Sequence, residues 1–191
     1  MPYWRNRLRR PLNGVLAVAS VLYPGMVYFG QGHVSPLTFI ALVLALFGLR
    51  LAASDRDAAN PWRFPIMLAA AMVVVLAFLD RELAVRVYPV LTSFGLAALF
   101  GFSLFRPPSM VERIARLHDP DLPPDAVVYC WRVTLVWTLF GLFNGAIAWS
   151  TAVWGTLETW TLWNGVVAYI LIGTLFIGEL MVRSVVRRKR A

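Results

Sequence analysis

The chain has one cysteine, two histidines and few acidic residues, and these shortages exclude several kinds of site. With Cys130 as the only cysteine, an intramolecular disulfide and a cysteine-based zinc site are both excluded. Because the topology predicted from the basic residues puts His33 and His118 on opposite faces of the membrane, cysteine–histidine catalysis lacks a second histidine within reach. The sequence contains no Gly-x-Ser-x-Gly elbow, Walker loop, histidine-rich metal cluster or cofactor fingerprint. We therefore expect no catalytic residues, no metal and no cofactor.

Apolar residues, in contrast, are abundant. Of the 191 residues 59% are hydrophobic, and the mean hydropathy is +0.66, more than a soluble domain of this length needs to fill one core. A helix that crosses a bilayer core about 30 Å thick needs about 20 mostly apolar residues. The pattern predicts an all-α, polytopic bundle of six transmembrane helices, forming one domain over residues 1–191. The predicted spans are residues 12–31, 35–53, 64–79, 87–105, 128–151 and 159–182.

The basic residues indicate the orientation, because cytoplasmic loops are enriched in Lys and Arg. If the N-terminus is inside, all of the 18 basic residues except Arg81 and Arg86 lie on the cytoplasmic side. The net charge of +8 then follows from topology, whereas nucleic-acid binding would need one basic patch with interleaved aromatic residues. We predict a multi-pass protein of the bacterial inner membrane with both termini in the cytoplasm, the lipid bilayer as partner and no nucleic acid. The oligomeric state is not indicated.

The cytoplasmic loop of residues 106–127, between the fourth and fifth predicted spans, has a legible structure of its own. Pro107-Pro108 ends the preceding helix, and Ser109 with Glu112 forms the Ser-x-x-Glu capping box of a new one. Apolar residues then share one helical face, as in a short amphipathic helix lying in the membrane interface, and Asp125 is placed to cap the fifth span. We expect a docking loop whose candidate residues are Ser109, Glu112, Arg113, Ile114, Arg116 and Leu117.

Polar residues inside the predicted spans are candidates for function or for helix packing, because polar groups are costly in lipid. Asn144-Gly145 and Asn164-Gly165 lie at similar depth on the fifth and sixth spans. We expect the two asparagines to hydrogen-bond to each other and the glycines to let these helices approach closely. Nearer the cytoplasm, Arg132 and Glu179 are placed to form an ion pair between the same spans. Each pair is open to a structural and to a ligand-binding or gating interpretation.

The first hairpin carries two further signals. Gln31 and His33 lie at its outer mouth, where a histidine is either a hydrogen-bonded interfacial residue or a ligand or proton-handling group. Within the first span, Tyr23-Pro24 leaves the carbonyl of Ser20 without its helical donor, which predicts a kink or a small polar pocket near the bilayer midplane. Tyr88-Pro89 echoes this dipeptide in the other half of the chain, as an inverted repeat of three spans plus three would.

Several short motifs carry a family resemblance. They are Tyr23-Pro24, Gly30-Gln31-Gly32-His33-Val34-Ser35-Pro36, Tyr88-Pro89-Val90, Arg106-Pro107-Pro108-Ser109-Met110-Val111-Glu112-Arg113 and Asp121-Leu122-Pro123-Pro124. Over nearly the whole chain they resemble an uncharacterised family of small proteobacterial inner-membrane proteins encoded beside aryl polyene (xanthomonadin-type) pigment biosynthesis genes. The second half is also distantly similar to intracellular septation protein A. The resemblance implies a pigment-pathway context and carries over no active-site residue.

Three functional hypotheses follow from these patterns. The leading one is a non-enzymatic accessory or scaffold protein that supports aryl polyene pigment or lipid-linked acyl biosynthesis at the membrane, with other inner-membrane or acyl-carrier pathway proteins as partners. The alternative is a small transporter or flippase for an amphiphilic lipid or pigment, which the kinked first span and the asparagines favour. The third is a membrane-embedded enzyme acting on acyl chains, which lacks a clustered acid, base or nucleophile.

Overall fold

The chain is almost entirely helical. The computed structural model describes residues 4–30, 32–53, 63–117 and 119–188, and the side chains in these ranges except those of residues 4–13, 15–17, 53 and 182–188. Helix accounts for 88%, and no strand forms in the described ranges, which confirms the all-α prediction. The elements are α1 (Trp4–Gly30), α2 (Pro36–Ala53), α3 (Arg63–Leu79), α4 (Arg81–Arg86), α5 (Tyr88–Phe105), α6 (Met110–Arg116), α7 (Pro124–Trp154), α8 (Leu157–Leu162), the π-helical η1 (Trp163–Val167) and α9 (Ala168–Arg188).

The helices have the length and surface of a membrane protein. Among the described residues, three stretches are long and apolar enough to cross a membrane: Tyr88–Phe105, Pro124–Trp154 and Leu157–Met181. Shorter apolar helices occupy the other predicted spans, at Val18–Gly30, Pro36–Ala52 and Arg63–Leu79. Large apolar side chains are widely exposed, with Phe78 and Phe105 86% and 85% exposed. Soluble proteins rarely leave so much apolar surface uncovered, whereas lipid accommodates it.

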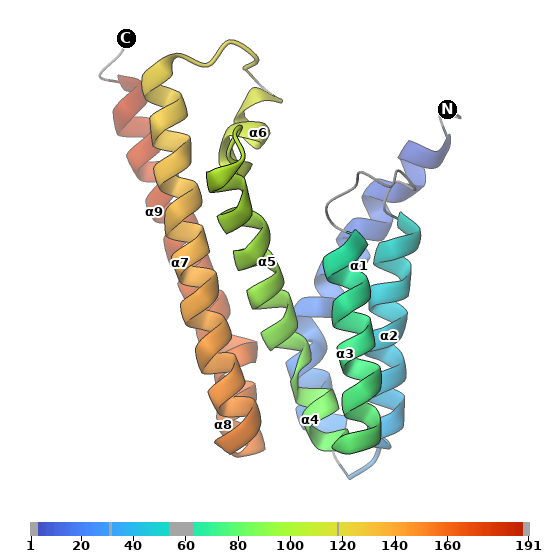
Figure 1. Ribbon diagram of the computed structural model, residues 1–191. Helices are drawn as coiled ribbons and strands as arrows, with labels where there is room; N and C mark the ends of the chain where they lie inside the picture. The colour runs from blue at the N-terminus through green and yellow to red at the C-terminus, as the bar shows by residue number, and fades with distance from the viewer. Residues whose placement is uncertain (1–3, 31, 54–62, 118, 189–191) are drawn as a thin grey trace.

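The helices form two arms that meet at one end and diverge toward the other (Figure 1). The first arm consists of α1, α2 and α3, and the second of α5, α7 and α9. Helix α4 and helix α8 lie where the arms meet, which we call the turn end. The opposite end is called the terminal end, because α1 begins there and α9 ends there.

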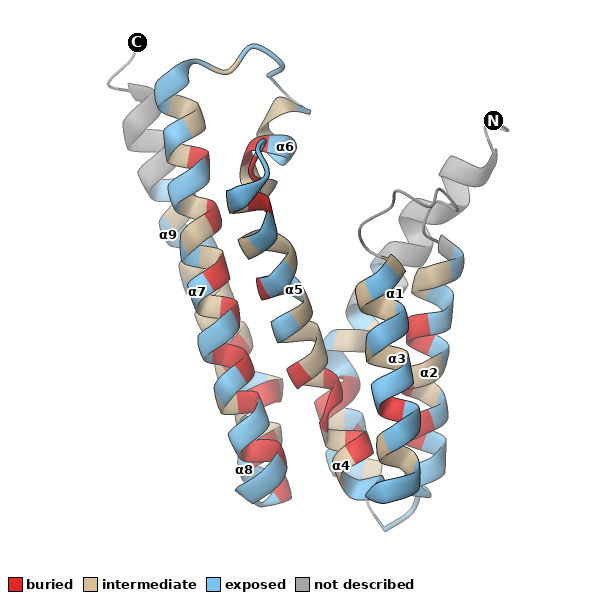
Figure 2. Cartoon of the chain, viewed as in Figure 1, coloured by how far each residue is buried: buried red, intermediate tan, exposed pale blue. Residues whose placement is uncertain are grey.

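The first arm is packed with large side chains. A buried core, which continues into α4, α5, α7 and α8, includes Tyr23 from α1, Phe39, Val43 and Phe47 from α2 and Val73 from α3. Figure 2 shows buried positions along α2, whereas most of α3 is exposed or partly exposed. Burying side chains of this size contributes about 1.5–3 kcal/mol each in water, and in lipid their close packing takes over that role.

The second arm is packed through small residues, and this corrects one prediction. A Cβ added to Gly141 of α7 would lie 3.0 Å from Cβ of Ala97 on α5, so the two backbones approach closely. A Cβ on Gly145 would meet the Phe94 ring of α5 at 2.9 Å. Gly145 was expected to face the sixth span, and that expectation is wrong. The glycine that follows Asn164 approaches the first arm instead, with Pro24 Cβ 3.5 Å from the added atom.

The loop helix α6 forms as predicted, but the side that it packs against the rest of the protein is not the apolar one. Glu112 accepts a hydrogen bond from the backbone N–H of Ser109 at 3.3 Å, as the capping box requires. Glu112, although it is charged, is only 5% exposed. The Val111 N–H donates to Thr134 Oγ1 of α7 at 3.2 Å, so this side of α6 packs on α7. The apolar side chains of Ile114 and Leu117 are left 51% and 81% exposed.

The predicted cap of the fifth span is wrong. Helix α7 begins at Pro124, with Pro123 in the N-cap position and Asp125 in the first turn. Proline suits the first helical position because its fixed φ is already helical and its missing N–H would have no partner there. Asp125 therefore lies inside the helix, where its charge interacts favourably with the positive end of the helix dipole.

Candidate functional site

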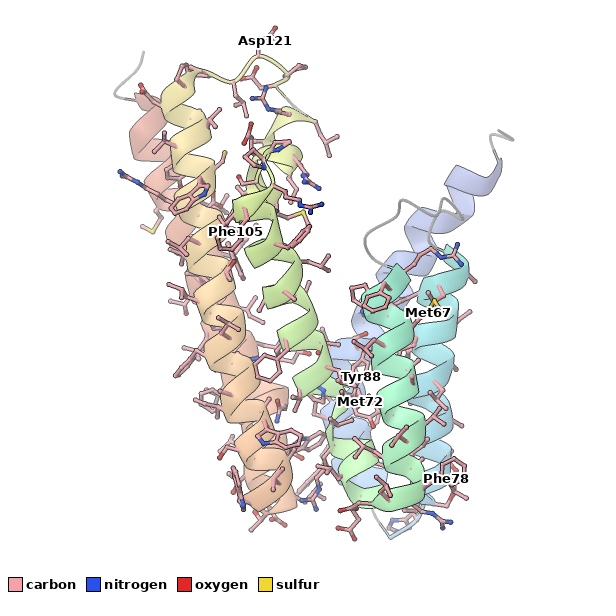
Figure 3. The ribbon with its side chains drawn as sticks, viewed as in Figure 1. Met67, Met72, Phe78, Tyr88, Phe105 and Asp121 are labelled. Carbon is pink, nitrogen blue, oxygen red and sulfur yellow. The ribbon has the colours of Figure 1, made fainter. Side chains whose placement is uncertain are left out.

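A cavity of about 320 Å³ lies where the two arms meet, bounded by residues of both. Its volume falls in the range of small-molecule sites. Tyr88, labelled in Figure 3 where α5 meets the first arm, contributes to its wall. The lining residues are Ser20, Val21, Pro24, Phe47, Arg50, Pro65, Ile66, Ala69, Tyr88, Pro89, Leu91, Thr92, Ser93, Gly95, Leu96, Leu99, Asn144, Asn164, Ala168, Tyr169 and Ile172. The wall is mostly apolar with a few polar groups, the composition expected of a site for an amphiphile.

The proline of α1 accounts for part of the polarity. Pro24 has no N–H to donate to the carbonyl of Ser20, four residues earlier. The hydroxyl of Tyr169 on α9 donates to that carbonyl at 3.5 Å. A residue of the other arm thus contacts the carbonyl that Pro24 leaves without its helical donor, and Ser20 lies in the cavity wall. The predicted kink and the depth in the bilayer stay predictions.

Arg50 brings a positive charge into the cavity. Its Nη2 donates to Ser20 Oγ at 2.8 Å, and the hydroxyl of Tyr88 donates to the same oxygen at 2.7 Å. Arg50 is the only charged residue among the described lining residues. In the sequence analysis Arg50 is only one of the basic residues that indicate the cytoplasmic side, and its place in a cavity was not predicted. An arginine inside a predicted apolar span was the available signal, because such residues usually face a cavity or a polar partner.

The two Tyr-Pro dipeptides contact each other across the joint of the arms. The Tyr23 and Tyr88 rings are 5.0 Å apart at their centroids. The Tyr23 hydroxyl donates to the carbonyl of Val85 at 2.7 Å, three residues before Tyr88. The Tyr88 hydroxyl donates to Ser20, three residues before Tyr23. The echo in the sequence therefore has a reciprocal counterpart in space, while a repeat of whole three-span units remains a prediction.

Asn144 and Asn164 both line the cavity, but they do not bond to each other as predicted. Asn144 Nδ2 donates to Ser93 Oγ of α5 at 3.0 Å, and its Oδ1 accepts from Trp163 Nε1 at 3.2 Å. Asn164 Nδ2 donates to the carbonyl of Trp160 at 2.8 Å and to Thr151 Oγ1 at 3.3 Å. The prediction failed because each amide found nearer partners, one across to α5 and one within its own helix turn.

The predicted ion pair between Arg132 and Glu179 does not occur among the described ion pairs, Arg86–Glu82 and Arg116–Glu112. The two helices nevertheless meet at this level. The hydroxyl of Tyr129 donates to the backbone carbonyl of Glu179 at 3.3 Å. Arg132 is exposed, so the depth estimate was right and the side-chain direction was wrong.

The outer mouth of the first hairpin stays apart from this cavity. Gln31 lies outside the described residues, and His33 is exposed on the turn that Gly32 makes with a φ of 82°. A smaller cavity of about 200 Å³ beside this turn is lined by Gly32 and Val34 together with Glu82 and Arg86. Since those two charges pair with each other at 3.8 Å, this cavity presents no unbalanced charge.

The basic residues of the docking loop hold the loop together. Arg113 donates from Nε to the carbonyl of Pro108 at 2.8 Å. Arg116 pairs with Glu112 at 2.8 Å and donates to the carbonyl of Pro120. Of the six candidate docking residues, Ile114 and Leu117 are the two whose apolar side chains are turned outward.

Comparison of the chain with protein-family models, with curated proteins and with solved structures finds no match. The function is therefore argued from the chemistry of the cavity and of the loop.

Proposed function

We propose that this protein is a non-enzymatic, multi-pass inner-membrane protein that takes an amphiphilic molecule from the bilayer into the cavity between its arms. The observation that carries the proposal is the cavity itself, which combines a mostly apolar wall with the Arg50, Ser20 and Tyr88 cluster. An apolar chain fits the wall and a polar head fits the cluster. The bound molecule is then either presented to a partner enzyme or carried across the membrane.

The proposed topology is six spans with both termini in the cytoplasm. Six apolar helical stretches support it, and so does the position of the start of α1 and the end of α9, which both lie at the terminal end. The distribution of basic residues supports it as well. In this orientation the arms diverge toward the cytoplasm, and the α6 loop lies on that side. The family resemblance suggests a pigment or a lipid-linked acyl chain as cargo.

The cavity can be tested with a phospholipid that carries a photoactivatable diazirine in its acyl chain. Wild-type protein should be labelled at cavity-lining residues. Gly95 lines the cavity and has nothing within 4 Å of an added Cβ, so Gly95→Phe should fill the cavity and abolish that labelling. Gly178→Phe is the matched control, because Gly178 has equally open surroundings and does not line the cavity. Equal labelling of all three proteins at the cavity would refute the proposal.

Holding and transporting an amphiphile are separated by a vesicle assay. Protein reconstituted with a fluorescent phospholipid is treated with a reductant that bleaches only the outer leaflet. Complete bleaching that depends on the protein and is lost in Gly95→Phe indicates transport. Bleaching of only the outer half, with labelling of the cavity intact, indicates presentation to a partner.

A docking role for the loop is a second proposal, favoured by the outward-facing Ile114 and Leu117. Replacing both with aspartate should reduce membrane-bound pigment in a producing strain if the loop recruits a pathway enzyme. The contact between α6 and α7 is made by the backbone N–H of Val111, so Ile114 and Leu117 can be replaced without breaking it. Unchanged pigment at a normal protein level would count against the docking role.

A further inference from the structure

Two polar groups of the cavity wall, Arg50 and Asn164, indicate which lipid head group the cavity accepts; we call them its two poles. This inference rests on the proposed function. The first pole is Arg50. A guanidinium group has five N–H donors, and the described part of the chain gives Arg50 one side-chain acceptor, Ser20 Oγ. No acidic residue is among the described lining residues, so within the described part of the chain the charge has no counter-ion in the cavity wall.

A cation in such surroundings favours an anionic ligand. Removing a charge from water is costly unless an opposite charge compensates it, and the cost is greatest in an apolar, lipid-facing setting. Arginine binds phosphate and carboxylate with two parallel hydrogen bonds, which also fixes their orientation. The Tyr88 hydroxyl, 2.7 Å from the same Ser20 oxygen, holds that oxygen beside the guanidinium.

The second pole is Asn164, which is 4% exposed. Its Nδ2 must face the Trp160 carbonyl, because a carbonyl only accepts hydrogen bonds. The amide oxygen Oδ1 is therefore on the other side, where it is buried and has no partner among the described residues. A buried acceptor without a donor costs about 1–3 kcal/mol. A ligand hydroxyl would supply the missing donor.

The backbone around Asn164 is irregular in the way that intramembrane binding sites often are. Asn164 lies in η1, where the N–H of Ala168 bonds to the carbonyl of Trp163 in a widened π-helical turn. Such turns occur frequently at functional sites. The neighbouring Gly165 approaches Pro24, where α1 lacks a helical hydrogen bond. Irregular backbone at membrane depth is tolerated where it lines a cavity.

We infer that the cavity binds an anionic lipid whose head group carries both an acidic group, held by Arg50, and a hydroxyl, held by Asn164. A phosphodiester with a hydroxylated substituent is the ligand chemistry that satisfies both poles. The apolar walls, which include Phe47, Ile66 and Leu99, accommodate the beginning of an acyl chain. The ligand is thus a membrane lipid and not a free anion.

The test uses the full chain purified in detergent and three lipids with identical acyl chains. Phosphatidylglycerol has the charge and the hydroxyls, phosphatidylmethanol has the charge alone, and phosphatidylcholine has no net charge. Native mass spectrometry measures the one-to-one adducts. Wild-type protein should bind phosphatidylglycerol about tenfold more tightly than phosphatidylcholine and about fivefold more tightly than phosphatidylmethanol. Inorganic phosphate should not displace the lipid.

Two variants separate the poles. Arg50→Met should bring phosphatidylmethanol and phosphatidylcholine to similar affinity, while phosphatidylglycerol keeps the advantage that its hydroxyls give. Arg50→Lys should restore part of the preference for the charged lipids. Asn164→Leu should bring phosphatidylglycerol and phosphatidylmethanol to similar affinity while both stay ahead of phosphatidylcholine. Arg132→Met is the matched control, because Arg132 is exposed and does not line the cavity. If Arg50→Met does not fold, Arg50→Gln keeps a donor for Ser20 without the charge.

The outcomes distinguish this inference from the proposed function. Lipid binding that Gly95→Phe abolishes but that shows no head-group preference would overturn the inference and leave the proposed function standing. Binding that is insensitive to Gly95→Phe would overturn both. A charge preference that persists in both Arg50→Met and Arg50→Gln would show that another group holds the anion. Displacement by inorganic phosphate at the concentration of the lipid would identify a free anion as the ligand.

Discussion

The helices of the first arm pack through large side chains, whereas α5 and α7 of the second arm touch through small residues, although both arms are bundles of apolar helices. In the first arm, Tyr23 of α1 and Phe39 and Phe47 of α2 are buried in one core, which continues to Tyr88 of α5. In the second, Gly141 and Ala97 allow α5 and α7 to touch along their backbones. Without a hydrophobic driving force in lipid, such close contact depends on van der Waals packing.

The two arms also differ in where their polar groups point. Within the second arm, Asn144 links α7 to Ser93 of α5 and to Trp163 of η1. In the first arm, Arg50 of α2 and Ser20 of α1 turn toward the cavity, and Ser20 reaches the second arm through Tyr88. The polar groups around Asn144 thus stabilise the second arm, whereas those around Ser20 connect the two arms. The cavity lies at this joint, where one kind of packing gives way to the other.

The largest effect should come from disturbing the backbone contact in the second arm. Gly141→Leu would force α5 and α7 apart, because even a Cβ at residue 141 lies 3.3 Å from the carbonyl oxygen of Ser93. We expect the free energy of unfolding to fall by about 3 kcal/mol, measured by denaturant titration in mixed micelles. Gly178→Leu, with nothing within 4 Å of an added Cβ, should cost little. Similar losses for both variants would contradict the close packing of α5 and α7.

A smaller loss is expected from the joint between the arms. Tyr23→Phe removes the buried hydrogen bond to Val85 and should cost about 1 kcal/mol. Tyr28→Phe on the same helix is the control, because Tyr28 is exposed. If the Tyr88 hydrogen bond to Ser20 contributes as much as the Tyr23 hydrogen bond to Val85, Tyr88→Phe should lower the free energy of unfolding by a similar amount. A negligible cost for Tyr23→Phe would show that the joint is held by ring packing alone.

A double-mutant cycle sharpens the role of the asparagines. Asn144→Ala combined with Ser93→Ala should show a coupling of about 0.6 kcal/mol, the average for hydrogen bonds between membrane helices. Asn144→Ala combined with Asn164→Ala should be additive, because the two amides have different partners. Coupling in the second cycle and additivity in the first would restore the pairing that the sequence suggested.

The sequence predicted the helices well because apolar runs, prolines and capping residues act locally. The end of α5 before Pro107-Pro108 and the start of α6 after Ser109 follow directly from such signals. The polar contact at the Ser20 carbonyl was predictable for the same reason, since a proline removes a specific hydrogen bond. These features depend on a few neighbouring residues and not on how the helices are rotated.

The candidate site was predictable only in part, because helix rotation is a property of the whole bundle. Depth along a helix follows from the rise of 1.5 Å per residue, so Asn144 and Asn164 were placed at a similar level. Which neighbour each meets depends on the direction in which its helix faces. Glu112 illustrates the same point, since the packing of α6 on α7 and not its own polarity decides that it is buried. The role of Arg50 became visible once Ser20 and Tyr88 were brought together.

The smallest effect is expected where the predicted ion pair is missing. Arg132→Gln and Glu179→Gln should each change the free energy of unfolding by less than about 0.5 kcal/mol, as surface substitutions usually do. Glu112→Gln is the positive control, because its carboxylate is buried and pairs with Arg116 at 2.8 Å, so a measurable loss is expected there. Tyr129→Phe should cost more than either of the first two, since the Tyr129 hydroxyl links α7 to the Glu179 carbonyl. If this hydrogen bond to the Glu179 carbonyl holds the ends of α7 and α9 together, the Arg132→Gln/Glu179→Gln double variant should also keep the free energy of unfolding nearly unchanged. A loss in the double variant that exceeds the sum of the single losses would show that the two charges interact.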